Sequence, residues 1–311
     1  MTAGDAAPAR RPSRRRVLGA VAALLAVAAL GWTLLDSWST VVDYDWELRP
    51  AWLAGAALVL TAAYRLAAEA YARVAGRLHP LGDGTRAALR RHWTISLLGR
   101  YVPGNVLMVA GRLELGRGVG LPRRVSLAAS VYEQILMLAA SALGGLAFLA
   151  LYGDLEGGAI LWAVAAIPVL AVVLHPALLE RLSGRLLRRA GREPLPAVLS
   201  TREMLLLFGL YVLVQAAVGV AAWMVVRGTA GPDAGALGFV ALGFQLAFAV
   251  SMLAFIFPSG LGVRDGVLAL VLSQNLPGGV GVAAAVLVRL AFTLFELAYA
   301  AGVVSSVRRR A

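Results

Sequence analysis

The chain of 311 residues contains no cysteine, which excludes disulfide bonds, thiolate catalysis and cysteine-based zinc sites. Its three histidines, His79, His92 and His175, are isolated and lack the spacing of metal ligands. No Ser/His/Asp set, no carboxylate pair with hydrolase spacing and no metal motif stands out. These absences argue against an enzyme, and we expect neither a cofactor nor a metal.

Charge is also scarce, since 15% of the residues are charged, 60% are hydrophobic and the mean hydropathy is +0.77. This composition is typical of a polytopic membrane protein and predicts an all-α integral membrane fold. Lysine is absent, so all 29 basic residues are arginine, and the formal net charge is +12. Because aromatic residues are not interleaved with the arginines, we exclude nucleic acid as a partner and expect cytoplasmic loops that face anionic lipid.

Apolar runs long enough to cross a hydrocarbon core of about 30 Å divide the chain. They lie near 17–35, 51–72, 125–151, 158–179, 203–226, 236–257 and 281–307, with shorter pieces at 94–111 and 264–276. We expect about seven to eight transmembrane helices in a single polytopic domain over 17–307. Its halves cover about 17–180 and 203–307, joined by a basic linker at 181–202.

Arginines determine the expected orientation. Five of them within 1–16 precede the first run, three follow the last run at 308–310, and the segment 36–47 after the first run is acidic. Because cytoplasmic segments are enriched in basic residues, we expect 1–16 and the tail 308–311 to be cytoplasmic. The run 17–35 is long enough to span and lacks a cleavage site at its end. It predicts an uncleaved first helix of a multi-pass protein of the plasma (inner) membrane.

The stretch LLGRYVPGNVLMVAGR at 97–112 places a proline, a glycine, an amide and charge inside an apolar piece that arginines flank on both sides. Irregular backbone at membrane depth is tolerated only where protein buries it or where it lines a wet cavity. We therefore predict that 94–112 is a re-entrant hairpin that enters and leaves on the cytoplasmic side, with its turn at 101–105. The alternative is an amphipathic surface helix broken by proline.

A second interruption lies in the other half, where FPSGLGVRDGVLALVLSQN at 257–275 combines a Pro/Gly break with a short charged helix. At 1.5 Å per residue the piece 264–276 reaches only about 20 Å, so it spans only if the break lies within the membrane. We predict a broken helix at 257–276, with 264–276 leading outward and 281–307 returning. One interrupted segment in each half indicates the central site of a transporter.

Both interruptions place arginine beside the start of a short helix, where free N–H groups and a partial positive charge favour phosphate. This arrangement indicates an anion clamp. Its candidate residues are Arg100, Pro103, Gly104, Asn105 and Arg112 at the first interruption, and Gly260, Gly262, Arg264 and Asp265 at the second. The alternative is that the glycines permit tight packing and the arginines extend to the membrane surface.

Three further charges, Glu133, Arg289 and Glu296, lie inside apolar helices. Charge at this depth is costly and favours a functional interpretation with a named partner. We interpret these residues as candidates for binding a polar head group. The alternative is a set of structural ion pairs, such as Arg289 with Glu133 or with Glu296.

Three motifs, LGRYVPGNVLMVAGR, SVYEQILML and FPSGLGVRDGVLALVL, resemble the flippase-like membrane domain of the lysylphosphatidylglycerol synthase transmembrane family. The resemblance covers about 15–307 and implies a stand-alone member without the soluble synthase domain. It also implies a role in moving or handling phospholipids or polyprenyl-phosphate-linked sugars. Gln134 and Asp265 stand where arginine and glutamate are commoner in the family, which bears on the preferred head group rather than on the fold.

The sequence thus predicts a protein that flips or binds an anionic phospholipid or a polyprenyl-phosphate-linked glycan. Arginines would hold the phosphate, Glu133, Asp265 and Glu296 would balance their charge, and the acyl or prenyl chains would stay in the bilayer. A non-catalytic scaffold that anchors a glycosyltransferase through the linker at 181–202 is the rival hypothesis. A membrane-embedded transferase is disfavoured, because no acid/base or metal set is visible.

Overall fold

The computed structural model describes residues 32, 35–36, 38–101, 106–153, 177, 181, 185, 188, 199–253, 262–277 and 279–308. Within these ranges the secondary structure consists of helices without strands. Four of the helices are long and apolar enough to cross a membrane: α3 (Pro50–Leu78), α6 (Arg123–Tyr152), α9 (Thr201–Thr229) and α12 (Val280–Arg308). The chain is therefore an all-α membrane protein, as its composition predicts.

Several predictions concern residues outside the described ranges. They include nearly all of the runs expected at 17–35 and 158–179, most of the linker at 181–202, and the terminal segments 1–16 and 309–311. The turns of both interruptions, at 102–105 and 254–261, also lie outside.

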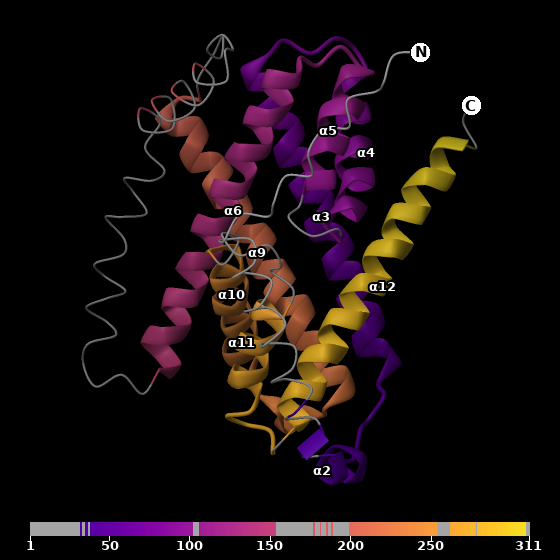
Figure 1. Cartoon of the computed structure of the whole chain (residues 1–311), viewed down its shortest axis with the longest axis vertical. Helices are drawn as coiled ribbons and strands as arrows, with labels where there is room; N and C mark the ends of the chain where they lie inside the picture. Colours follow the sequence, from indigo (N-terminus) through magenta and orange to yellow (C-terminus); the bar gives the residue numbers. More distant parts are fainter. Residues whose placement is uncertain are drawn as a thin grey trace, which may run out of the picture.

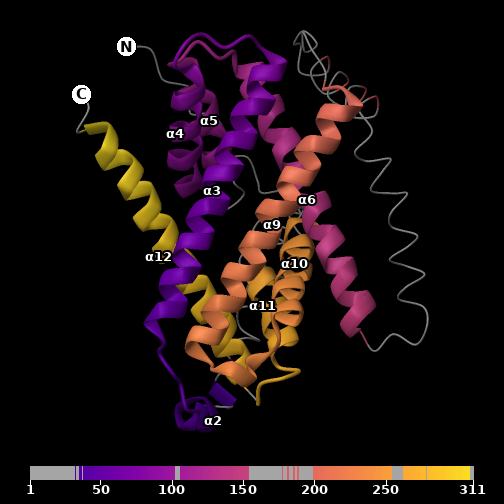
Figure 2. The same cartoon turned by 180° about the vertical axis from the view of Figure 1, so that it is seen from behind.

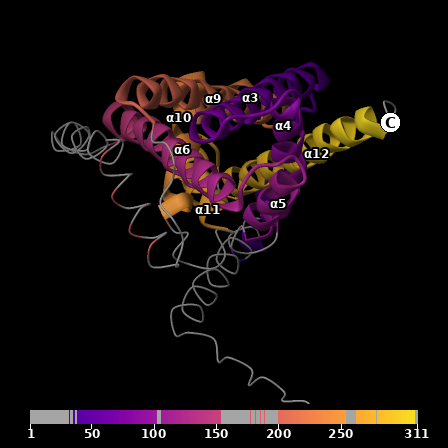
Figure 3. The same ribbon diagram turned by 90° about the horizontal axis from the view of Figure 1, so that it is seen from above.

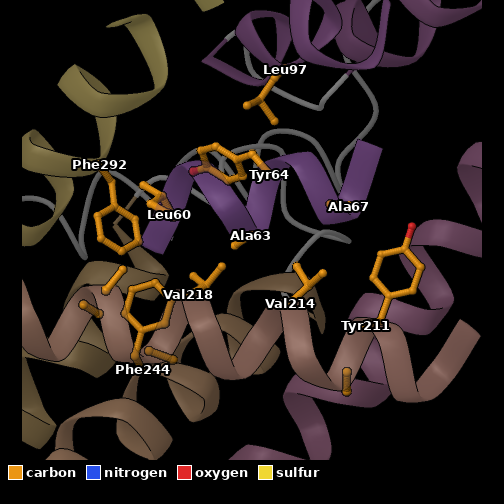
Figure 4. Close-up of a cluster of buried hydrophobic side chains, with 14 of the residues drawn as sticks. Leu60, Ala63, Tyr64, Ala67, Leu97, Tyr211, Val214, Val218, Phe244 and Phe292 are labelled. Atoms are coloured by element: carbon orange, nitrogen blue, oxygen red, sulfur yellow. The ribbon is translucent and has the colours of Figure 1, made fainter. Parts of the chain in front are cut away.

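The helices α3 and α9 lie side by side and make the most extensive contact among the described elements (Figures 1 and 2). Buried side chains of α3, among them Leu60 and Ala63, face Val214 and Val218 of α9 (Figure 4). Of the twelve buried residues of α3, ten are alanine, leucine or valine and two are tyrosine, and alanine lets two helix backbones approach closely. This pair therefore forms the main helix contact of the described bundle.

The start of α9 is fixed by a capping box. Ser200 accepts a hydrogen bond from the backbone N–H of Glu203, and the Glu203 carboxylate accepts one from the backbone N–H of Ser200. This arrangement satisfies donors that the first turn of a helix leaves without partners. Glu203 also pairs with Arg77 of α3, with 3.1 Å between Nε and Oε1, which ties the two central helices together at this end.

The first interruption forms a hairpin of α4 (Thr85–Leu97), the short 3₁₀ helix η1 (Leu98–Tyr101) and α5 (Val106–Arg117). The two helices run antiparallel, since Gly99 packs against Met108 and Ser96 against Gly111. A Cβ atom on Gly99 would lie 2.6 Å from the backbone nitrogen of Met108, so only glycine fits this close approach. The hairpin predicted at 94–112 is therefore present, although its first helix starts earlier, at Thr85.

The second interruption forms another hairpin, of α10 (Leu237–Leu253) and α11 (Val263–Leu272). At 17 and 10 residues, these helices reach only about 26 Å and 15 Å. They run antiparallel, because Gly243 packs against Val271 and a Cβ atom on Gly235 would lie 3.3 Å from Nδ2 of Asn275. The structure thus differs from the prediction that 236–257 crosses, because α10 starts at the end of the bundle to which α11 returns. The expected directions of 264–276 and 281–307 agree with α11 and α12, since α11 runs to that end and α12 runs back from it.

One end of the bundle is rich in arginine, and we call it the basic end. It gathers the ends of α3, α5 and α12 and the starts of α4, α6 and α9 (Figure 1). Glu69 pairs there with Arg73, Arg86 and Arg90 at 3.0–3.2 Å. A hydrogen bond from Arg123 holds the pKa of Glu114 below its usual value. The opposite end carries the other termini of α3, α6, α9 and α12, with α2 (Trp38–Asp43) and the 3₁₀ helix η2 (Pro232–Ala234) (Figure 1).

That opposite end is rich in aromatic side chains, and we call it the aromatic end. The rings of Trp52 and Trp223 meet edge to face, 5.2 Å apart, and those of Tyr44 and Trp46 are 5.0 Å apart. Tryptophan and tyrosine favour the interface between membrane and water, because one edge of each ring system is polar. An end rich in arginine and interfacial aromatic rings are both typical of helical bundles that cross a bilayer.

The two described halves repeat the same order of helices. In each half a long helix is followed by a hairpin of two shorter helices and then by a second long helix: α3, α4, α5, α6 and α9, α10, α11, α12. However, α3 ends at the basic end and α9 ends at the aromatic end, so that the hairpins enter from opposite ends (Figures 1 and 2). The bundle is therefore built as an inverted repeat, an arrangement that recurs among transporters.

Candidate functional site

A buried ion pair joins the first hairpin to α6. Arg112 of α5 contacts Glu133 of α6 through both terminal nitrogens, with distances of 2.5 Å and 3.2 Å to the carboxylate oxygens. Trp93 of α4 donates its indole N–H to the same carboxylate at 2.8 Å, and Nε of Arg112 donates to the Ser96 hydroxyl at 3.0 Å. The side chains of Arg112 and Glu133 are each only 1% exposed. The pair is therefore sealed from both water and lipid.

Aromatic rings and hydroxyl groups enclose this pair. The guanidinium carbon of Arg112 lies 4.9 Å from the ring centre of Tyr71 and 5.7 Å from that of Trp93. Ser126 of α6 donates to the backbone carbonyl of Arg112 at 3.1 Å, and its oxygen lies 3.0 Å from the Tyr71 hydroxyl. Every nitrogen of the Arg112 guanidinium thus has an acceptor, so this arginine holds the hairpin in place rather than presenting a free charge.

A second ion pair joins the second hairpin to α12. Asp265 of α11 accepts a hydrogen bond from Arg289 of α12, and Nε of Arg264 lies 3.5 Å from the other Asp265 oxygen. The guanidinium carbon of Arg264 lies 5.7 Å from the ring centre of Phe244. The side chains of Arg264 and Arg289 are 22% and 30% exposed. In contrast to the first pair, these arginines are accessible from outside the protein.

The start of α11 adds positive electrostatic potential beside Arg264 and Arg289. Gly262 precedes the helix with a φ of 93°, a conformation that favours glycine, and Arg264 and Asp265 lie in the first turn. The first turn of a helix exposes N–H groups and a partial positive charge. Asp265 is therefore stabilised by the helix start as well as by two arginines, and an incoming anion would meet the same groups.

A third buried carboxylate connects the two halves. Glu296 of α12 is 1% exposed and accepts a hydrogen bond from the hydroxyl of Tyr64 in α3. The Tyr64 ring lies 5.9 Å from that of Tyr299 and 6.2 Å from that of Trp93. This contact fixes the middle of α12 against the central helix α3.

The structure therefore groups the predicted site residues in a way that the sequence did not. Arg112 and Glu133 form one cluster, Gly262, Arg264, Asp265 and Arg289 form another, and Glu296 stands with Tyr64. The pairing of Arg289 with Glu133 or Glu296, considered from the sequence, does not occur, because Glu133 and Arg289 lie on different halves and each has a partner in its own hairpin. Arg100 lies in η1, and Pro103, Gly104, Asn105 and Gly260 lie outside the described residues.

Sequence reasoning missed three residues that hold these charges, namely Tyr64, Trp93 and Ser96. None of them belongs to a motif, and each acts through contacts between different helices. A further polar contact inside the bundle, from Nε2 of Gln245 to the backbone carbonyl of Gln215 at 2.5 Å, could have been suspected. Glutamine within an apolar helix indicates a hydrogen bond between helices.

Among the described residues, no group of histidine, aspartate and glutamate is arranged to hold a metal ion. The arrangement can instead do two things: keep hairpins fixed to long helices through buried charge, and offer partly exposed arginines to an anion within an apolar bundle.

A comparison with protein families agrees with this chemistry. The family model described as the lysylphosphatidylglycerol synthase TM region matches residues 20–299. The chain belongs to this family. The match covers both hairpins and all four long helices except the last residues of α12, so the membership rests on the whole described bundle. Searches of curated proteins and of solved structures gave no match.

Proposed function

We propose that the chain moves an anionic lipid between the two leaflets of the plasma (inner) membrane, with the basic end in the cytoplasm. The observation that carries the proposal is the cluster of Arg264, Asp265 and Arg289, which is partly exposed although it lies between apolar helices. Membership in a family named for the membrane part of a lipid-modifying enzyme supports a role in lipid handling. The phosphate would bind the two arginines, and its acyl or prenyl chains would remain in the bilayer.

The proposed binding step is an exchange of anions. In the structure the Asp265 carboxylate pairs with the guanidinium groups of Arg264 and Arg289. It therefore supplies the negative charge that these partly buried arginines need. A lipid phosphate offers more acceptor oxygens than a carboxylate and can take the place of Asp265 on Arg289. When the phosphate leaves, Asp265 recovers its partners, which lowers the cost of releasing the lipid.

The test is leaflet exchange in liposomes, followed with a fluorescent phospholipid and with a fluorescent polyprenyl phosphate. Arg264→Gln and Arg289→Gln each remove one charge-assisted contact, worth about 1.5–3 kcal/mol, and should weaken lipid binding roughly ten- to hundredfold. Asp265→Asn removes the competing anion and should bind lipid more tightly but exchange it more slowly. Arg91→Gln, on the exposed side of α4, is the matched control and should behave as wild type.

Two results would count against the proposal. Unchanged amounts of co-purified lipid in well-folded Arg264→Gln and Arg289→Gln proteins would show that this cluster does not bind the phosphate. If neither lipid moves with wild type, while neutralising the linker arginines abolishes function in cells, a scaffold for a glycosyltransferase would replace the flippase. Those arginines are Arg181, Arg185, Arg188, Arg189 and Arg192.

A further inference from the structure

Arg65 places a positive charge deep within the long helix α3. Its side chain is exposed, and it lies 13 residues after Trp52, whose ring belongs to the aromatic end. At 1.5 Å per residue this separation is about 20 Å, so in a hydrocarbon core of about 30 Å the boundary at the basic end lies roughly 10 Å farther along the helix. With Trp52 at one boundary, Arg65 is therefore well inside the apolar region.

The protein surface around Arg65 is apolar. Helices α3 and α9 form one side of the bundle, and no described helix covers them on that side (Figures 2 and 3). Ala62 and Leu58 precede Arg65 by three and seven residues, so they share its face of α3, and both are exposed, Leu58 to 72%. On α9, Leu213 is 61% exposed beside Val214, which faces α3 (Figure 4). Arg65 thus belongs to a surface whose other large side chains suit lipid tails.

The protein does not compensate the charge of Arg65. Among the residues that the structure describes, Arg65 makes neither a hydrogen bond nor an ion pair. Glu69, one turn farther along α3, is instead bound by three arginines of the basic end. Glu133 and Glu296 are each 1% exposed inside the bundle, so they are not available at its surface.

The rest of the apolar sequence offers no partner either. The long apolar runs 17–35 and 158–179, of which the structure describes little, contain no aspartate or glutamate. A carboxylate partner for Arg65 at its own depth is therefore lacking in the chain, and a counter-charge has to come from the membrane.

The direction of the side chain adds to this requirement. Cα–Cβ bonds in a helix tilt toward its N-terminus, and the N-terminus of α3 lies at the aromatic end (Figure 1). The Arg65 side chain therefore leaves the backbone in the direction away from the basic end. Long basic side chains near a helix end usually extend to the nearby water. For Arg65 this route is long, so a polar group has to approach the arginine instead.

We infer that Arg65 binds the phosphate of a membrane lipid, whose head group then lies against α3 below the surface of the bilayer. Every phospholipid supplies a phosphate, and a guanidinium group can bind two of its oxygens in parallel. Bilayers lower the high cost of an intramembrane arginine by local thinning and by admitting water. Arg73, two turns closer to the basic end and 53% exposed, continues the basic surface from Arg65 toward the water.

This site deepens the function proposed above, on which one part of the inference rests. If the protein moves lipid between leaflets, Arg65 is the position at which a head group from the basic end enters the apolar region. The binding of phosphate at this depth does not depend on translocation and can be measured without it.

Fluorescence quenching by nitroxide lipids in liposomes tests the site, and single labels can be placed freely because the chain contains no cysteine. Bimane on Ala62→Cys reports the surface beside Arg65. Bimane on Leu294→Cys is the matched control, since Leu294 of α12 is 64% exposed. Ala62 and Leu294 each precede by two residues a member of the contact between Tyr64 and Glu296, and both helices end at the basic end. The two labels therefore lie at similar depth on different helices.

We expect a phospholipid with a nitroxide on its head group to quench the label at 62 more strongly than the label at 294. A phospholipid with a nitroxide in its acyl chain should quench both. Arg65→Leu should reduce head-group quenching at 62 to the level at 294, whereas Arg65→Lys, which keeps the charge, should retain most of it. Equal head-group quenching at the two positions, or quenching at 62 that Arg65→Leu leaves unchanged, would overturn the inference.

Lipid binding and stability give independent measurements. Native mass spectrometry should show that Arg65→Leu weakens the binding of phosphatidylglycerol at one site roughly ten- to hundredfold. Inorganic phosphate should not compete, because it does not enter hydrocarbon; effective competition would refute a site at this depth. Arg65→Leu should also melt no lower than wild type in detergent, since no protein group loses a partner. A fall as large as that of Glu133→Gln would show a structural partner and overturn the inference.

The same variants separate this site from the proposed function. Head-group quenching that depends on Arg65, without lipid exchange by wild type, would refute translocation and leave the site standing. Lipid exchange at the wild-type rate in Arg65→Leu would refute Arg65 as the entry position and leave translocation standing.

Discussion

Replacing Glu133 with glutamine tests whether the sealed pair holds the first hairpin. The substitution keeps the shape of the side chain but removes the charge that Arg112 and Trp93 share. Arg112 remains ionised and 98% buried, so its desolvation is no longer compensated. Removing one partner of a buried pair costs about 3–5 kcal/mol. At about 2–4 °C per kcal/mol, the melting temperature should fall by roughly 6–20 °C.

A double variant distinguishes the charge effect from a loss of packing. In Arg112→Met with Glu133→Leu no charge is left buried, and apolar side chains of similar size fill the space. Buried pairs replaced in this way are often neutral for stability. The indole N–H of Trp93 still loses its acceptor, which costs about 1–3 kcal/mol. We therefore expect the double variant to be more stable than Glu133→Gln, even though it changes more atoms.

Thermal denaturation of the purified protein in detergent, read by size-exclusion chromatography after heating, gives these differences. Arg73→Gln is the control, because it removes an arginine of an exposed ion pair and should leave the melting temperature nearly unchanged. A Glu133→Gln protein that melts within 2 °C of wild type would refute the assignment of the pair as a structural contact. A double variant less stable than both single variants would show that the pair contributes net stability.

Three further predictions use the same assay. Tyr64→Phe leaves the buried Glu296 without this donor and should cost about 1–3 kcal/mol; no change would mean that the carboxylate does not need it. Gly145→Leu forces α6 away from Leu246 and should cost about 1–3 kcal/mol, whereas equal stability would show that the helices part freely. Gln245→Leu removes the hydrogen bond to α9 and should cost about 0.6–1.7 kcal/mol; higher stability would contradict a bonded glutamine.

The sequence was sufficient for the fold class and for both interruptions, because these depend on local chemistry. Hydropathy identifies the long helices, and proline with glycine marks each break wherever the chain folds. The end of the bundle from which the second hairpin enters could not be predicted from the sequence, for a physical reason. The run 236–257 is apolar over a length sufficient to span, so composition alone does not show that α11 runs back beside α10 to the same end of the bundle.

The ion-pair partners of the charged residues could not be predicted from the sequence either. A charged residue in an apolar helix predicts that a partner exists, but the partner is chosen by tertiary packing. Arg112 and Glu133 were each identified as candidates, yet nothing in their spacing indicated that they pair. The same holds for Trp93, which reaches Glu133 only because α4 and α6 both contact α5. Exposure, which separates a sealed pair from an accessible one, is also a property of the assembled bundle.

The two hairpin pairs have opposite polarity, so the two halves of the inverted repeat differ in residue identity at this contact. In the first half the hairpin carries the arginine and the long helix the carboxylate, while in the second half the hairpin carries the carboxylate and the long helix the arginine. The attraction between two charges depends only on their product, so exchanging the positions of arginine and carboxylate preserves the ion pair. The residue at each of the two positions nevertheless differs between the halves. It also makes the halves unequal toward an anion. The first half confines its arginine between aromatic rings, whereas the second half places Arg289 on α12 with its side chain 30% exposed.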